Sequence, residues 1–245
     1  MGLLATASFA IFFLASLAVG VRLLLLARRT RQLPELALAI GFLVGGVLGY
    51  GLLAAVTADL TPAGVLGDVA VYLGSASLRL GALMVAFFTW RVFRPDEAWA
   101  KGWFTLLCAL AVAGLVTRVA VGPVKHTQDS ALLFWTANLL TTGCYTWGTI
   151  ESVRFHRVLR RRERLGLGDP AVATRVMLWA IGTGCPALVT LLSYLAWFRG
   201  EDPLRSPFQS VSYLLIATSA VAAWLAFFPL RHRGRSADTA PGASG

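Results

Sequence analysis

The chain has 245 residues, of which 57% are hydrophobic and 14% are charged, and its net charge is +10. Charged residues make up about one quarter of a soluble domain, and a mean hydropathy of +0.68 is high for that class. The composition therefore excludes an ordinary soluble domain and points to an integral membrane protein. Apolar segments fill the chain, so no room remains for a soluble catalytic or DNA-binding domain, and we expect no nucleic acid partner.

Seven stretches are long and apolar enough to cross a bilayer, which takes about 20 residues of helix. They cover approximately residues 3–27, 33–57, 68–93, 102–121, 130–153, 171–198 and 208–230. Short loops join them, and a polar stretch follows the last one. The sequence therefore predicts an all-α protein with one domain of seven transmembrane helices over residues 1–230. Residues 231–245 are predicted to form a disordered cytoplasmic tail.

The distribution of basic residues predicts the orientation of these spans. With the spans placed as above, sixteen of the 22 Lys and Arg residues lie at the first, third and fifth loops or in the tail, and four lie on the opposite side. Positive charge gathers on the cytoplasmic side of membrane proteins. The N-terminus is therefore predicted to lie outside and the C-terminus in the cytoplasm. The compact Ala-, Gly- and Arg-rich chain favours a plasma membrane, the inner membrane of a bacterium, as its location.

Seven helices with an outer N-terminus resemble the layout of microbial rhodopsins and seven-helix receptors. The resemblance covers topology alone. Rhodopsins hold retinal on a lysine of the seventh span, whereas Lys101 and Lys125 both lie at loops. Since a Schiff base needs a lysine amine, we expect no retinal.

Groups that bind metals or haem, or that act in acid–base catalysis, are missing from the predicted spans. The three histidines lie in loops or in the tail, and no acidic residue lies in the middle of a span. The three cysteines lie inside spans without a CxxC pair, which is typical of packing residues. We therefore expect no metal site, no cofactor and no enzymatic activity.

Two polar stripes are candidates for a ligand site. The stripe in the third span contains Asp68, Tyr72, Ser75 and Arg79. The stripe in the fifth span contains Asn138, Thr142 and Tyr145. Residues three and four apart share one face of a helix, and a polar face in a membrane protein turns toward the bundle interior or a cavity.

Arg79 has two interpretations. In the first, backbone carbonyls, hydroxyls and Asp68 satisfy its charge, and Arg79 fixes helix packing. In the second, Arg79 lines an outward-facing cavity between the third, fifth, sixth and seventh spans, where it binds an anionic or carbonyl-bearing ligand. The sequence leaves both interpretations open.

Three further features concern packing, movement and partners. Pro186 interrupts the sixth span and predicts a kink that serves as a hinge. Glycines at four-residue spacing in the second span predict close helix packing inside the bundle or, as an alternative, a dimer interface. The basic cluster after the fifth span contains Arg157, Arg160, Arg161, Arg162 and Arg164. Its charge favours contact with anionic lipid headgroups at the cytoplasmic face, or a cytoplasmic protein partner.

These features support three functional hypotheses. The first is a receptor-like or sensory protein that binds a small ligand in an outer cavity. The second is a small-solute transporter, because similar residue patterns in the first and last three spans fit two halves joined by a linker helix. The third is a structural subunit of a membrane complex.

Overall fold

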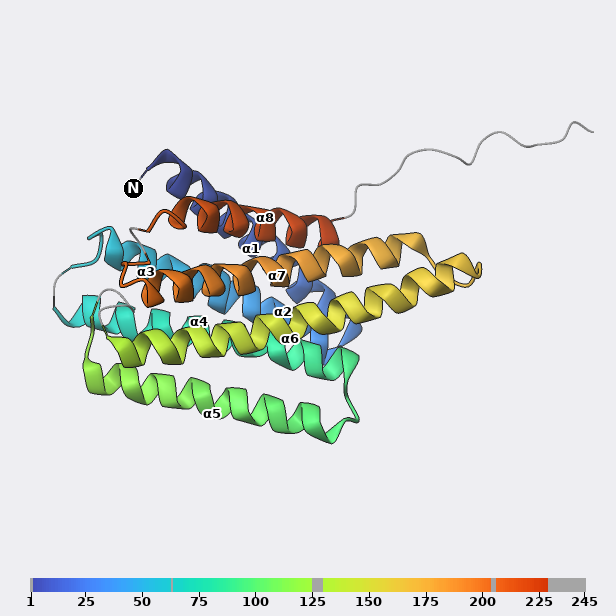
Figure 1. The fold of residues 1–245 in the computed structure, drawn as a ribbon, viewed down its shortest axis with the longest axis horizontal. Coiled ribbons are helices and arrows are strands. Elements are labelled where there is room, and N and C mark those ends of the chain that lie inside the picture. The colour runs from blue at the N-terminus through green and yellow to red at the C-terminus, as the bar shows by residue number, and fades with distance from the viewer. Residues whose placement is uncertain (1, 63, 125–129, 204–205, 229–245) are drawn as a thin grey trace, which may run out of the picture.

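In a computed structural model, the chain folds into a bundle of long antiparallel helices (Figure 1). The structure describes residues 2–62, 64–124, 130–203 and 206–228. The regular structure within these ranges is entirely helical. The predicted tail, residues 231–245, lies outside the described residues.

Nine helical elements form seven rods within the described ranges. They are α1 (Leu3–Thr30), α2 (Leu33–Ile40), η1 (Gly41–Gly49), α3 (Tyr50–Thr57), α4 (Val65–Phe93), α5 (Ala98–Val121), α6 (Ala131–Arg164), α7 (Pro170–Phe198) and α8 (Gln209–Phe227). The elements α2, η1 and α3 follow one another without a break, and we call them together the second rod. Its middle part, η1, is a π-helix. π-Helical turns are rare in proteins, and those that occur are often found at functional sites.

Six of the seven rods are long and apolar enough to cross a membrane, counted over the described residues. The all-helical, multi-pass character of the chain and its contact with a lipid bilayer follow from this finding. The exception is α6, which covers the predicted span 130–153. Threonines, Asn138 and aromatic residues with polar groups lower its hydropathy.

Six rods pack in a ring, and each touches the next in the order α1, second rod, α4, α6, α7, α8 and back to α1. The helix α5 lies outside this ring against α4 and α6, along one edge of the bundle (Figure 1). A closed ring of helices surrounds an axial space, which side chains fill or leave open. The side chains that line this axial space therefore determine which ligands the bundle can bind.

The glycines of the second rod pack against α4. A Cβ atom on Gly45 would lie 2.6 Å from the Cα atom of Gly81, and one on Gly41 would lie 3.3 Å from the side chain of Met84. Small residues let two helix backbones approach this closely. This confirms the prediction that the glycine face serves packing inside the bundle.

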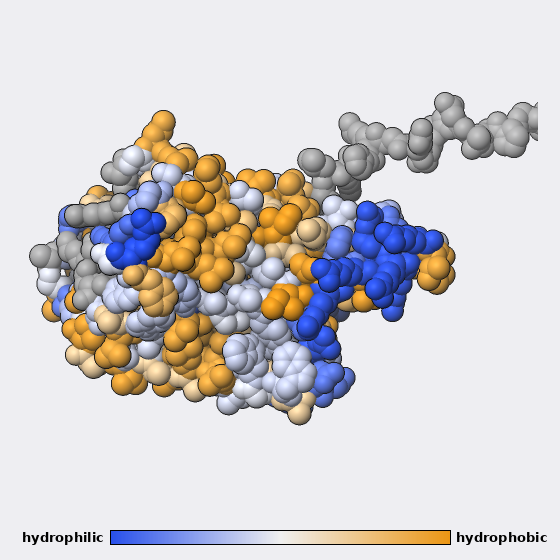
Figure 2. All heavy atoms as spheres, in the orientation of Figure 1, coloured by the Kyte–Doolittle hydropathy of each residue, from blue (hydrophilic) through white to orange (hydrophobic). Residues whose placement is uncertain are grey.

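The helices α6 and α7 extend beyond the other helices at one end of the bundle, which we call the basic end (Figure 1). With 34 residues, α6 is about 51 Å long, whereas the hydrocarbon core of a bilayer is about 30 Å thick. Hydrophilic residues cover this end, and apolar residues dominate the middle of the bundle (Figure 2). All five arginines of the predicted basic cluster are exposed there.

Candidate functional site

A cavity of about 150 Å³ lies inside the ring and is lined by all seven rods. We call it the central cavity. Its walls are mostly apolar and include Phe12, Phe42, Tyr50, Tyr145 and Trp179. The second rod contributes more lining residues than any other rod, through the π-helix and the turns beside it. A cavity of this size holds a molecule about as large as benzene.

Arg79 reaches this cavity from α4 and is 6% exposed. Its Nη1 donates a hydrogen bond to the backbone carbonyl of Ser75 at 3.1 Å. Its Nε and Nη2 have no hydrogen-bond partner among the described residues, and the same holds for the buried hydroxyl of Ser75. Buried polar groups are hydrogen-bonded in the great majority of cases, so three unpartnered polar atoms beside one cavity require an explanation.

The guanidinium of Arg79 lies against Gly114 of α5. A Cβ atom at position 114 would come within 2.7 Å of Arg79 Nε. Glycine at this position therefore leaves the space that the guanidinium occupies. The rotamer of Arg79 depends on α5, although α5 stands outside the ring.

A second arginine, Arg118, lines the same cavity one helical turn after Gly114. Its Nη1 donates to the carbonyl of Val124 at 3.0 Å, and its charge acts repulsively on Arg79. The residues that line the cavity include no Asp, Glu, His or Cys. The cavity lining therefore carries two guanidinium groups and no carboxylate among the described residues, and an anion beside Arg79 would reduce the repulsion between the two guanidiniums.

The structure brings three of the predicted site residues to the central cavity, namely Ser75, Arg79 and Tyr145. Asp68 is exposed, and Tyr72 is half-buried away from the cavity lining. Asp68 precedes Arg79 by 11 residues, which is about 16 Å along the helix. Asp68 therefore does not pair with Arg79 in the described contacts, in contrast to the first interpretation.

The remaining two predicted residues lie in helix contacts outside the cavity lining. Asn138 donates its amide to the carbonyl of Phe134 within α6 at 2.9 Å. Thr142 donates to Thr190 Oγ1 at 2.9 Å and lies 3.2 Å from the hydroxyl of Tyr194. The polar stripe of α6 therefore divides: Asn138 bonds within α6, Thr142 joins α6 to α7, and Tyr145 lines the cavity. A ligand-binding role for Asn138 and Thr142 stays a prediction.

Pro186 lines the cavity from the middle of α7. Proline has no N–H, so the carbonyl of Gly182, four residues earlier, lacks its usual helical donor. The hydroxyl of Ser219 in α8 donates to that carbonyl at 2.6 Å. This hydrogen bond joins α7 to α8 at the turn where Pro186 removes a helical hydrogen bond. The predicted hinge at Pro186 is thus held by a neighbouring helix.

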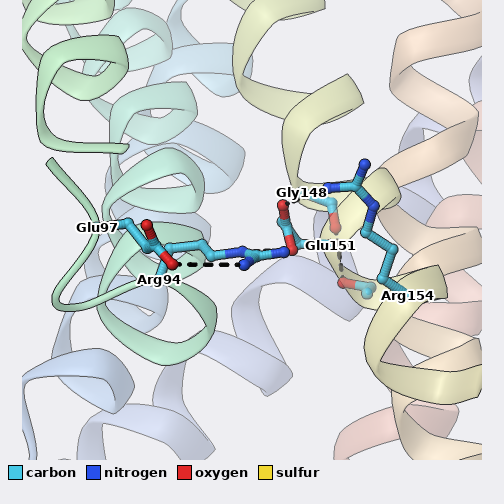
Figure 3. A network of polar contacts seen from close by, with 6 residues as sticks. Arg94, Glu97, Gly148, Glu151 and Arg154 are labelled. Atoms are coloured by element: carbon cyan, nitrogen blue, oxygen red, sulfur yellow. Dashed lines mark hydrogen bonds and ion pairs between the residues drawn. The ribbon is translucent and has the colours of Figure 1, made fainter. Parts of the chain in front are cut away.

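A separate polar network lies at the basic end, where Glu151 of α6 is buried (Figure 3). Its carboxylate accepts from Arg94 Nε at 3.0 Å and from Arg154 Nη1 at 3.1 Å. The side chain of Arg94 comes from the end of α4, so the first pair joins two helices. The pair with Arg154 matches the local pairing that the three-residue spacing favours.

Comparison with family models, with curated proteins and with solved structures finds no match for this chain. The functional argument therefore rests on the central cavity and its charge. Sequence patterns identified Arg79 but not Arg118, which lies near the end of an apolar helix and looked like a loop residue. Its spacing of four residues from Gly114 is the signal that places it on the face turned toward α4.

Proposed function

We propose that the protein is a receptor-like membrane protein of seven spans that binds a small anion in the central cavity. The proposal treats α6 as the seventh span, because α6 packs against α4, α5 and α7 along the bundle. It keeps the orientation that the basic residues favour, with the basic end in the cytoplasm of a bacterium. The anion-binding part of the proposal depends on the chemistry of the central cavity.

The observation that supports anion binding most directly is that two of the three guanidinium nitrogens of Arg79 have no hydrogen-bond partner among the described residues. Two of its nitrogens lie buried beside the cavity without a partner in the described part of the chain. An arginine presents several N–H donors in one plane and pairs with carboxylate or phosphate through two parallel hydrogen bonds. An anion that reached this edge of the guanidinium would accept a hydrogen bond from both nitrogens.

The size and the walls of the cavity restrict the anion further. Five aromatic side chains belong to the lining, and the volume of about 150 Å³ suits one small ring. Benzoate combines a ring of that size with one carboxylate. It is therefore a suitable probe, and benzamide is a neutral control of nearly the same shape.

A receptor-like role follows from the position of Pro186 and Ser219, which both line the cavity. A ligand that contacts this part of the wall lies beside the interrupted turn of α7. The other end of α7 meets α6 at the basic end, where the exposed arginines offer a surface for anionic lipid or for a protein partner. A non-enzymatic role is favoured because the cavity lining offers no acid–base pair.

The test is benzoate binding to the purified protein in detergent, measured by isothermal titration calorimetry. Hydrogen bonds to a charged group contribute about 1.5–3 kcal/mol, so Arg79→Gln should weaken binding at least about tenfold. The matched control is Arg91→Gln, which removes an exposed arginine of the same helix and should leave the affinity unchanged. Equal affinity for benzoate and benzamide, or full binding by Arg79→Gln, would contradict the proposal.

A further inference from the structure

A second cleft of about 320 Å³ lies at the basic end, between the ends of α1, α4, α6, α7 and α8. We call it the basic-end cleft. Two arginines line it, Arg22 from α1 and Arg175 from α7, and its other walls are apolar and largely aromatic. Neither arginine forms an ion pair with another residue of the described ranges. The guanidinium of Arg22 instead lies 4.4 Å from the ring centre of Phe228.

The central cavity and the basic-end cleft share one wall residue, Trp179 of α7. Its indole is 7% exposed and meets three other rings edge-on, those of Phe88 at 5.5 Å, Phe227 at 5.9 Å and Phe42 at 6.4 Å. One side chain therefore belongs to both spaces. Movement of this indole would join them.

Arginine is the only charged residue type in the described lining of both spaces. The lining of each contains two arginines, and neither lining contains an acidic residue. Arg79 and Arg118 are buried, whereas Arg22 and Arg175 are exposed, and buried charged residues in a membrane bundle mark ligand or ion pathways. Arg79 lies near the middle of α4, and Arg22 and Arg175 lie at the basic end; such positive groups attract anions and repel cations.

We propose that the protein carries a small anion between the central cavity and the basic-end cleft, with Trp179 as the partition that the anion passes. The proposal rests on anion binding in the central cavity. In this route the anion leaves Arg79 and Arg118 and is received by Arg22 and Arg175. The step involves no covalent change, and the concentration gradient sets its direction.

The test measures anion uptake by liposomes that contain the purified protein. Benzoic acid crosses bilayers in its neutral form, so the probe for uptake is radiolabelled benzenesulfonate, which stays charged. We expect saturable uptake that protein-free liposomes lack and that excess benzoate inhibits. Arg175→Gln and Arg22→Gln should each lower the rate about tenfold while benzoate binding in detergent is kept. The matched control is Arg157→Gln, an exposed arginine at the same end, which should change neither quantity.

Variants of the partition provide the second measurement. Trp179→Ala should raise the uptake rate several-fold because it removes the shared wall, and Trp179→Phe should have a smaller effect of the same sign. Because Trp179 also lines the benzoate site, the SDS unfolding transition followed by circular dichroism reports whether each variant is folded. Uptake that is absent in the wild type, although benzoate binds, would overturn transport and leave anion binding intact. Loss of benzoate binding in the wild type would overturn both. Uptake that no Trp179 or arginine variant alters would exclude this route.

Discussion

The hydrogen bond from Ser219 to the carbonyl of Gly182 should stabilise the fold mainly because Pro186 is present. The donor and acceptor oxygens are 2.6 Å apart and buried. Hydrogen bonds between membrane helices contribute about 0.6 kcal/mol on average and reach about 1.7 kcal/mol. An unpaired buried carbonyl costs about 1–3 kcal/mol. The Ser219→Ala variant loses the bond and leaves the carbonyl without a donor, so we expect a loss of about 1.5 kcal/mol.

The Pro186→Ala variant allows the cost of Ser219→Ala to be compared with and without Pro186. An alanine at position 186 has an N–H, which can donate to the carbonyl of Gly182 within α7. In that background, Ser219→Ala should cost only about 0.5 kcal/mol. The double-mutant cycle therefore predicts a coupling of about 1 kcal/mol between positions 186 and 219.

The assay is reversible unfolding in mixed micelles with rising SDS content, followed by far-UV circular dichroism. Ser212→Ala is the matched control on α8, because the Ser212 hydroxyl donates to the carbonyl of Phe208 in its own helix. This control should change stability by less than about 0.5 kcal/mol. An equal cost of Ser219→Ala with and without Pro186, within about 0.3 kcal/mol, would refute the reasoning.

Two further predictions concern the basic end and α5. Arg94→Gln should destabilise the protein by about 2 kcal/mol and Arg154→Gln by less than about 1 kcal/mol, because the first side chain is 31% exposed and the second 60%. The same unfolding assay tests this, and the reverse order would contradict it. Gly114→Ala should displace the guanidinium of Arg79 and weaken benzoate binding about tenfold by calorimetry. Gly102→Ala, with open space around its Cβ, is the control, and equal affinities of these two variants would show that α5 does not position the guanidinium.

The helical class was predictable because long apolar segments have few other solutions in a bilayer. The rods lie close to the predicted spans, as α4 and α7 illustrate with Val65–Phe93 against 68–93 and Pro170–Phe198 against 171–198. The expected span over residues 130–153 is longer in the structure, because α6 continues through Arg-rich turns outside the apolar region. The length of an apolar segment predicts which part of a helix lies in lipid, but it does not predict where the helix ends in water.

The candidate site was predictable only in part. Arg79 stands out in any hydropathy profile, and Ser75 follows from helical spacing. The contribution of the second rod was missed because its glycines indicate packing, whereas here the same face both packs and lines a cavity. The polar stripe on α6 divides because its side chains contact different neighbours. The sequence of one helix does not predict those contacts.

The most direct test of the account is the distance between a bound anion and the guanidinium of Arg79. Solid-state NMR can measure dipolar coupling between carboxyl-labelled [13C]benzoate and a protein whose arginine side chains carry 15N. A bidentate pair places the carboxyl carbon about 4 Å or less from the guanidinium nitrogens. We predict a coupling of that size in the wild type that disappears in Arg79→Gln and persists in Arg91→Gln. The absence of coupling with benzoate bound, or a coupling that survives Arg79→Gln, would contradict the account.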